Sequence, residues 1–312
     1  WDYILRIVGW VKRQCNPTKS IQFWFCLREL HFIKNIMHKL LSGNLKTEKL
    51  IVKIPNLPLS LAGLKLVQMS DFHYDNYLLS TKMLTEAIAV SNTAKPDLVI
   101  LTGDYVNTIA RPIHQLALEL KNLESRFGVY AVLGNHDIYY PSSKSEIINA
   151  LTNVGINVLW NQIAYPVGET LPLVGLADIY SREFNPELIM NQLDSTTPRI
   201  VLSHNPDTAE ILQKWRVDLQ LSGHTHGGQI VIPGKRPVIV YYIKIIEKIP
   251  KKIRRKLPFL HQTHAILKHW KWSEGLHQVG NNQLYVNRGL GTYFPGRLFC
   301  PPEVTIITLE GE

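Results

Sequence analysis

The sequence has few cysteines and no long uninterrupted hydrophobic run. Its 312 residues include three cysteines (Cys15, Cys26 and Cys300), an odd number without the spacing of a metal site. This excludes a disulfide framework and favours a reducing compartment. Because no run reaches about eighteen apolar residues, we expect no bilayer-spanning helix in this sequence. Internal repeats and low-complexity linkers are also missing, which favours one main domain.

Positive charge is concentrated in two segments. Residues 1–60 hold ten Lys and Arg against three Asp and Glu, and residues 239–272 hold nine against Glu247 alone. The formal net charge is +9, so the remainder of the chain is net negative. A basic isoelectric point therefore does not indicate one nucleic-acid-binding surface, and we expect no nucleic-acid partner.

Both basic segments are also rich in large apolar residues. Over residues 27–41 the apolar positions recur near helical spacing, while Arg28, Lys34 and Lys39 lie off that stripe. Such a stripe either packs on the domain's own core or lies at a membrane surface, as Trp, Phe and basic residues at this density favour. We interpret residues 1–50 as a basic amphipathic segment that associates with anionic lipids at a membrane surface. Whether an anchor or signal precedes Trp1 in the full protein stays an open question.

Between the basic segments, short apolar runs alternate with amphipathic stretches. The expected strands are Leu64–Met69, Leu98–Leu101, Val129–Leu133, Leu171–Leu176, Ile200–Leu202 and Val217–Leu221. The expected helical stretches include Ile113–Phe127, Ser143–Val154 and Asp207–Trp215. This alternation predicts an α/β fold with largely buried strands.

Polar clusters follow several of these runs, where each expected strand ends. They read SDFH, TGDYVN, LGNHD, LSHNP and SGHTH, and they offer Asp71, His73, Asp104, Asn135, His204, His224 and His226. Singly, each residue has a simpler explanation as a helix cap, a turn residue or a core histidine. Because open α/β sheets place their sites at the carboxyl edge of the strands, we expect the clusters to converge. Carboxylates, one amide oxygen and imidazoles without thiolate favour divalent Mn, Fe, Zn or Co.

In this order, the motifs DxH, GD, GNHD, an isolated His and GHTH resemble those of the calcineurin-like metallophosphoesterases, over about residues 64–312. The resemblance implies a two-sheet αββα sandwich over residues 51–312. The basic, aromatic segment at about 239–272 exceeds what the resemblance leads us to expect, and an insertion of this kind fits a cap over a substrate that bears acyl chains. The resemblance also implies two divalent metal ions, which we expect to be Mn, with Fe or Zn as alternatives. The first ion would be held by Asp71, His73, Asp104 and His226. Asp104 would bridge to the second ion, which would be completed by Asn135, His204 and His224.

The resemblance assigns a different role to His136, which follows the expected ligand Asn135. As the family's non-ligand histidine, it would act on the leaving-group oxygen as proton donor or cationic stabiliser. The alternative is that His136 only braces its loop. The role of Asp137 stays open. Two cations would lower the pKa of a shared water and draw charge off the phosphoryl oxygens.

One motif separates this chain from the protein serine/threonine phosphatases, which carry GDYVDRG. Here GDYVNT places Asn107 and Thr108 where those enzymes have Asp and Arg, which argues against a protein phosphatase. The stretches SLAGLKLVQMSDFH, GHTHGGQ and LYVNRGLGTYFPGRLFCPPEVTIITL resemble the bacterial membrane-associated YkuE/YaeI-type branch. Some members of that branch are similar to the UDP-2,3-diacylglucosamine pyrophosphohydrolase of lipid A synthesis.

The sequence therefore predicts a dinuclear metallophosphoesterase at the cytoplasmic face of the inner membrane, either peripheral or held by an upstream anchor. The expected partners are a lipid-linked sugar nucleotide and the membrane surface. The favoured reaction cleaves the pyrophosphate of UDP-2,3-diacylglucosamine into UMP and the acylated sugar 1-phosphate. The alternatives are a phosphodiesterase or phosphatase of the same branch that acts on a cell-wall or phospholipid substrate, and a nucleic-acid phosphodiesterase.

Overall fold

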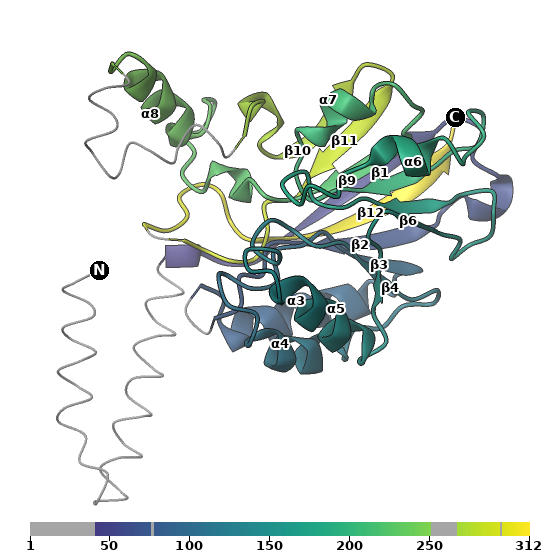
Figure 1. Ribbon diagram of the computed structural model, residues 1–312, viewed down its shortest axis with the longest axis horizontal. Coiled ribbons are helices and arrows are strands. Elements are labelled where there is room, and N and C mark those ends of the chain that lie inside the picture. The colour runs from purple at the N-terminus through teal and green to yellow at the C-terminus, as the bar shows by residue number, and fades with distance from the viewer. Residues whose placement is uncertain (1–40, 76–77, 251–266, 294) are drawn as a thin grey trace, which may run out of the picture.

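The computed structural model describes residues 41–75, 78–250, 267–293 and 295–312, which form two six-stranded sheets (Figure 1). In spatial order, the first sheet consists of β1 (Lys46–Ile54), β12 (Glu303–Gly311), β2 (Lys65–Met69), β3 (Leu98–Leu101), β4 (Val129–Ala131) and β5 (Asn157–Val158). The second consists of β10 (Gly275–Val279), β11 (Asn282–Val286), β9 (Leu219–Ser222), β8 (Ile200–Leu202), β7 (Leu173–Gly175) and β6 (Gln162–Ala164).

Most strands of both sheets run in parallel, which fixes where the polar clusters gather. In the first sheet β2 to β5 are parallel, whereas β12 is antiparallel to β2 and parallel to β1. In the second sheet β7, β8, β9 and β11 are parallel, with β6 and β10 antiparallel at the two edges. The parallel strands of each sheet therefore end together along one edge.

The apolar side chains of the central strands alternate between two cores. In β3, Leu98 and Ile100 pack between the sheets, while Val99 and Leu101 pack under the helices of the first sheet. All four side chains are buried, because side chains alternate between the faces of a strand and both faces of this strand are covered. This explains why the buried strands read as continuous apolar runs.

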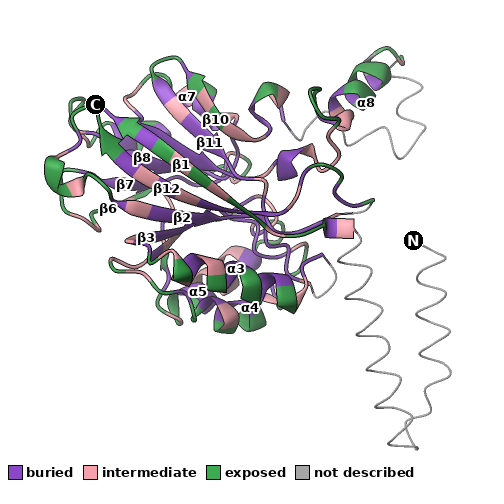
Figure 2. Ribbon diagram, turned by 180° about the vertical axis from the view of Figure 1, so that it is seen from behind, coloured by how far each residue is buried: buried purple, intermediate pink, exposed green. Residues whose placement is uncertain are grey.

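Helices cover the outer face of each sheet. The first sheet carries α3 (Thr81–Thr93), α4 (Ile113–Leu120) and α5 (Ser143–Thr152), whereas α6 (Pro186–Met190) and α7 (Thr208–Leu212) lie on the second (Figures 1 and 2). In α3, Ser80 caps the first turn by accepting a 3.2 Å hydrogen bond from Met83 N, and buried residues at helical spacing face the sheet. The layers confirm the predicted αββα sandwich.

The helices are shorter than the sequence pattern predicts. The stretch expected over Ile113–Phe127 ends as helix α4 at Leu120, where the side chain of Asn122 donates a 3.0 Å hydrogen bond to Glu119 O. This bond satisfies a carbonyl that the helix end leaves open. The expected helices over Ser143–Val154 and Asp207–Trp215 likewise end early, as α5 and α7. The strands β3 and β8 have the predicted bounds, and β2, β4, β7 and β9 differ at one or both ends by one or two residues.

The basic segments are only partly within the described residues. Residues 1–40 lie outside them, and β1 begins at Lys46, so the last residues of the expected N-terminal segment form part of the first sheet. Helix α8 (Val238–Glu247) begins the inserted segment, whose residues 251–266 also lie outside. Among the helices that are described, none is both long and apolar enough to cross a bilayer.

Candidate metal centre

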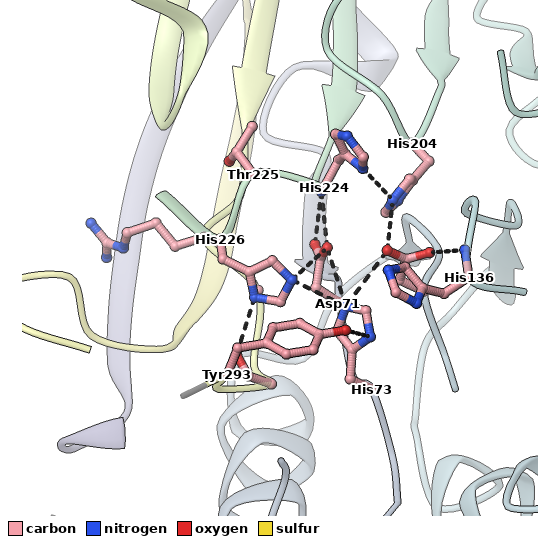
Figure 3. A network of polar contacts seen from close by, with 12 residues as sticks. Asp71, His73, His136, His204, His224, Thr225, His226 and Tyr293 are labelled. Atoms are coloured by element: carbon pink, nitrogen blue, oxygen red, sulfur yellow. Dashed lines mark hydrogen bonds and ion pairs between the residues drawn. The ribbon is translucent and has the colours of Figure 1, made fainter. Parts of the chain in front are cut away.

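The predicted ligands lie at the carboxyl ends of strands from both sheets. Asp71, Asp104 and Asn135 follow β2, β3 and β4 of the first sheet, whereas His204 and His224 follow β8 and β9 of the second. A single open sheet would place these residues along one edge, but the structure brings the edges of two facing sheets together (Figure 3). The clusters therefore meet between the layers of the sandwich.

One group of possible ligands consists of Asp71, His73 and His226. The Nε2 atoms of His73 and His226 lie 3.0 Å apart, and His226 Nε2 lies 3.4 Å from Asp71 Oδ1. All three side chains are buried, and the Asp71 carboxylate also accepts the backbone N–H of His224 at 3.0 Å. This group lies at one end of the site, beside Tyr293 (Figure 3).

A second group consists of Asp104, His204 and His224. Asp104 Oδ2 lies 3.0 Å from His204 Nε2, and His204 Nε2 lies 3.3 Å from His224 Nδ1. The same carboxylate oxygen of Asp104 is 3.5 Å from His73 Nε2, in the first group. Asp104 thus lies between the two groups, where the sequence predicts a bridging ligand.

The backbone at these residues is strained in a consistent way. Left-handed φ angles occur at five of the predicted ligands: Asp71 (51°), His73 (43°), Asp104 (56°), His224 (72°) and His226 (51°). Such conformations are uncommon for residues other than glycine and cluster at functional sites. Gly134 and Gly223 leave room for the carboxylates, because a Cβ atom at either would overlap Asp104 or Asp71 respectively. The close approach explains the glycines in GNHD and GHTH.

Hydrogen bonds to Nδ1 orient three of the imidazoles. His204 Nδ1 lies 2.6 Å from Thr102 O, and His226 Nδ1 lies 3.2 Å from Gly291 O. A carbonyl oxygen only accepts, so Thr102 O requires a proton on Nδ1 of His204, and Gly291 O favours one on Nδ1 of His226 over the longer 3.4 Å contact of that atom with Arg297 Nη2. In the neutral rings Nε2 then keeps its lone pair. His73 Nδ1 contacts Tyr293 Oη at 2.7 Å, and that hydroxyl donates to Asn107 Oδ1 at 2.8 Å. Outer contacts of this kind fix metal-ligating histidines.

The donor atoms fit divalent metal ions. When His73 donates its Nδ1 proton to Tyr293, its Nε2 lone pair faces that of His226 at 3.0 Å, an arrangement that a cation stabilises. Asn135 Oδ1 is buried and accepts no hydrogen bond from the described residues, which leaves it available as a ligand. Carboxylate, amide and imidazole donors suit borderline-to-hard divalent ions. The geometry is compatible with the seven predicted ligands, and their ligation stays a prediction.

Burial and charge set the protonation of the centre without metal. Burial lowers the pKa of His73 to about 3, and it also holds the pKa of His226 well below its usual value. Burial alone would also lower the pKa of His204, but the Asp104 carboxylate outweighs it and raises this pKa to about 10. Burial similarly opposes ionisation of Asp104, yet His204 and the other imidazoles hold the pKa of Asp104 well below its usual value. His204 and Asp104 therefore form an ion pair before metal binds.

The loop after β4 positions His136 beside the ligands. His136 N donates to Asp104 Oδ1 at 2.9 Å, and His136 Nδ1 lies 2.5 Å from Asn107 O. Because the carbonyl of Asn107 can only accept, it holds the Nδ1 proton and orients the ring. Protein phosphatases carry Asp at the position of Asn107. In this protein the backbone carbonyl of Asn107, rather than a carboxylate, orients the His136 ring. His136 also lies within ligand range of His73 and Asp104, and its role on the leaving group stays a prediction.

Asp137, whose role the sequence leaves open, organises the loops around the centre. Its carboxylate accepts backbone N–H groups of Asp104, Tyr105 and Gly134 at 2.8 Å each, and that of Val106 at 3.3 Å. Burial raises the pKa of Asp137, and the four N–H donors oppose this shift by favouring the carboxylate. Asp137 thus fixes the loop of Asp104 to the loop of His136.

Three residues at the centre were missed by the sequence reasoning. Tyr293 contacts His73, and Arg297 donates hydrogen bonds of 2.6 Å to Gly291 O and 3.3 Å to His226 O. Both belong to the C-terminal motif, but neither has a local signal that points to the metal site. Asp178 does have such a signal, because it follows an apolar run as the ligands do. Asp178 is buried, and its Oδ2 has no hydrogen-bond partner among the described residues.

Comparison with known proteins agrees with this geometry. Residues 64–228 match the family described as calcineurin-like phosphoesterase, which uses dinuclear metal centres. The chain is 30% identical to phosphodiesterase YaeI of Escherichia coli (strain K12), over 80% of this chain and 83% of YaeI. It is also 30% identical to the uncharacterized metallophosphoesterase YkuE of Bacillus subtilis (strain 168), over 85% and 86% of the two chains. Identity to the UDP-2,3-diacylglucosamine pyrophosphatase LpxG of Chlamydia trachomatis is 27%, over 84% and 88%.

Proposed function

Because the chain belongs to the calcineurin-like phosphoesterase family and is a hydrolase, we propose that it cleaves the pyrophosphate of a lipid-linked sugar nucleotide at a membrane surface. The favoured substrate is UDP-2,3-diacylglucosamine. Water adds across the P–O–P linkage, so that one product gains the hydroxyl oxygen and the other the proton. The products are UMP and 2,3-diacylglucosamine 1-phosphate. We propose Mn as the metal, with Fe or Zn as alternatives.

The side chains of this site would divide the chemistry among them. Asp71, His73, Asp104 and His226 would hold one divalent ion, and Asp104 would share the second with Asn135, His204 and His224. Two such ions supply a nucleophile at neutral pH and offset the negative charge of the phosphoryl oxygens. His136, with its Nδ1 proton held by Asn107 O, directs its other ring nitrogen away from that carbonyl and is free to act on the leaving-group oxygen.

The position of the basic, apolar additions supports a lipid-bearing substrate. Helix α8 follows His226 closely in the chain and lies outside the two-sheet body, on the side of the metal centre (Figure 1). The described N-terminal end is at the same side, because Leu41 O accepts the backbone N–H of Arg297 at 2.6 Å. Both additions thus join the body beside the site, where acyl chains and a bilayer would have to approach.

Helix α8 itself combines exposed apolar and basic side chains. Tyr241 is 42% exposed and Ile245 63% exposed, and Lys244 lies between them in sequence. A depression of about 640 Å³ at the base of the helix is lined by Ile232, Gly234, Lys235, Arg236, Val240, Tyr241 and Lys244. Such a surface suits an anionic lipid interface, where basic residues near the membrane each contribute on the order of 1 kcal/mol. We propose that the enzyme acts at the cytoplasmic face of the inner membrane, and this surface supports contact with an anionic bilayer.

The observation that carries the hydrolytic chemistry is the Asp104 carboxylate between two ligand groups. The test is a turnover panel with defined metals on UDP-2,3-diacylglucosamine, bis-p-nitrophenyl phosphate, a phosphopeptide and single-stranded DNA. We expect UMP release from the first substrate, slow turnover of the small diester and none of the last two. Rapid turnover of DNA, or no UMP release in mixed micelles, would overturn the lipid-linked substrate.

Replacing residues 239–272 by a short Gly/Ser loop tests the cap. Hydrolysis of the diacylated sugar nucleotide should fall much more than hydrolysis of the small diester, because only the former has acyl chains to hold. A parallel fall of both activities would make the segment part of the fold. An unchanged rate with the lipid substrate would remove the cap from the proposal.

A second candidate is a phosphodiesterase that acts on a cell-wall or phospholipid substrate. It is favoured by the 30% identity to a protein named phosphodiesterase, which is higher than the 27% to LpxG. Preferred turnover of a phospholipid diester over UDP-2,3-diacylglucosamine in the same panel would establish this candidate instead.

A further inference from the structure

A cavity of about 320 Å³ lies beside the metal centre and is used by none of the predicted ligands. Its walls come from the loop after β4, the start of α5, the turn before β6 and the loop after β7. The lining includes three aromatic side chains, Tyr140, Trp160 and Tyr180, and two cations, Lys144 and Arg182. It is thus an aromatic and polar cavity, unlike the apolar, basic surface of α8.

The cavity adjoins the reacting end of the site. Ile138 and Tyr140 belong to the loop that carries His136, and they line one wall. On the other wall, the ring of Tyr180 lies 6.4 Å from the ring of His224, centroid to centroid. His224 and His204 stand at the opposite end of the centre from His226 and Tyr293 (Figure 3). A group in this cavity would therefore adjoin the reacting phosphoryl group on the side away from the inserted segment.

The charges in the cavity leave one cation available. Glu183 accepts hydrogen bonds of 2.7 Å from both Lys144 Nζ and Trp160 Nε1. Lys144 Nζ also lies 4.7 Å from the Trp160 ring centroid, so this trio fixes the indole and neutralises the lysine. The Arg182 side chain is exposed and forms no hydrogen bond or ion pair within the described part of the chain. Its backbone φ is 61°, a conformation that non-glycine residues rarely adopt.

We propose that this cavity binds the nucleoside of a nucleotide whose phosphoryl group lies at the metal centre. The inference rests on the proposed function and specifies which part of the substrate each end of the site holds. Aromatic side chains stack on any nucleobase, and a free arginine meets the anionic charge of a nucleotide. The volume is at the lower end for ligand sites, enough for a base and ribose but not for two acyl chains. The acyl chains then belong at the opposite end, beside α8.

Calorimetric titration of the metal-loaded protein tests the base-binding role without turnover. UMP and ribose 5-phosphate share the sugar and the phosphate, and only UMP carries a base. Wild-type protein should bind UMP roughly tenfold more tightly than ribose 5-phosphate, as stacking of one base predicts. Tyr180→Ala should reduce this preference severalfold, and Tyr180→Phe should restore it because the ring remains. Arg182→Ala should weaken binding of UMP, and Arg182→Lys should recover part of it.

Tyr165→Ala is the matched control, because Tyr165 is 49% exposed, Tyr180 is 51% exposed, and Tyr165 does not line the cavity. The proposal is overturned if wild-type protein binds both ligands equally, or if Tyr165→Ala loses the preference as Tyr180→Ala does. The proposed lipid substrate can fail separately. If UMP is preferred through Tyr180 but UDP-2,3-diacylglucosamine is not hydrolysed, the nucleoside site stands and the lipid-linked substrate falls.

Discussion

The backbone N–H of His136 donates a 2.9 Å hydrogen bond to Oδ1 of Asp104, while Oδ2 of the same carboxylate faces both groups of predicted ligands. One side chain therefore links the placement of both metal ions to the placement of the residue expected at the leaving group. Substitution at Asp104 should affect metal content and the His136 loop together, whereas substitution at His136 should leave the ions in place.

Asp104→Ala should lower occupancy of both metal positions and abolish turnover, because the shared ligand is lost. The fold should survive, since the main apolar cores do not include this residue. Elemental analysis measures the metal content and circular dichroism the fold, with the exposed Asp194→Ala as the control. Two full metal equivalents in an active Asp104→Ala protein would refute the ligand assignment.

His136→Ala should retain metal and lose rate by roughly 10²–10⁴-fold with a sugar-phosphate leaving group, as for a positioned proton donor. The loss should be smaller for p-nitrophenyl esters, whose leaving group needs no proton. Parallel rate and metal measurements separate the roles. If the variant loses metal, or slows equally with both leaving groups, His136 is a ligand or a structural residue.

Tyr293→Phe should weaken metal binding by about 10–100-fold, the usual effect of losing an outer hydrogen bond to a ligand. The hydroxyl connects His73 Nδ1 to Asn107 Oδ1, so its removal frees the imidazole to rotate. Competition with a chelator of known affinity measures the change. The exposed Tyr165→Phe should bind metal like the wild type, and an equal loss there would argue against an orienting role for Tyr293.

Metal uptake should release a proton from His204. Burial opposes its charge, but Asp104 raises the pKa of His204 to about 10, so the imidazolium persists at neutral pH in metal-free protein. A metal at Nε2 must displace that proton, and apparent affinity should therefore rise with pH up to about 10. Calorimetry in buffers of different ionisation enthalpy counts the protons. The His204→Asn variant should release about one proton fewer on metal binding than the wild type, and the exposed His114→Asn variant should release the same number as the wild type. Equal proton release by His204→Asn and the wild type would contradict the assignment of the proton to His204.

The residues of the site were largely predictable, because each of its motifs is local. Asp71 and His73 follow one apolar run directly, and Gly223 and His224 follow another. The same sequence pattern therefore predicts both where a strand ends and which residues are candidate ligands. Asp178 likewise comes shortly after an apolar run, Leu171–Leu176, so the same pattern indicates it as a candidate ligand. Its place beside the ligands could have been expected from the sequence.

Contacts between distant parts of the chain could not be predicted in this way. β1 pairs with β12 through partners such as Lys46 and Glu303. The sequence pattern of neither strand predicts that it pairs with the other. The hydrogen bond between Tyr293 and His73 likewise depends on how the C-terminal loop passes over the first sheet. The ligands are divided between two sheets because the apolar faces of the sheets pack against each other. The alternation of apolar runs and amphipathic stretches in the sequence does not specify how many sheets form or how they pack.

The parallel pairing of β1 with β12 determines which way the metal centre faces when the protein is attached to a solid support. β1 starts at Lys46 on the side of the metal centre, and β12 carries the chain to Gly311 at the far side of the sheets (Figure 1). Coupling a sensor surface through Glu312 would leave the centre facing the solution, whereas coupling through the exposed side chain of Lys46 would turn it toward the surface. Ligand capture on such a chip should therefore depend on which end is fixed.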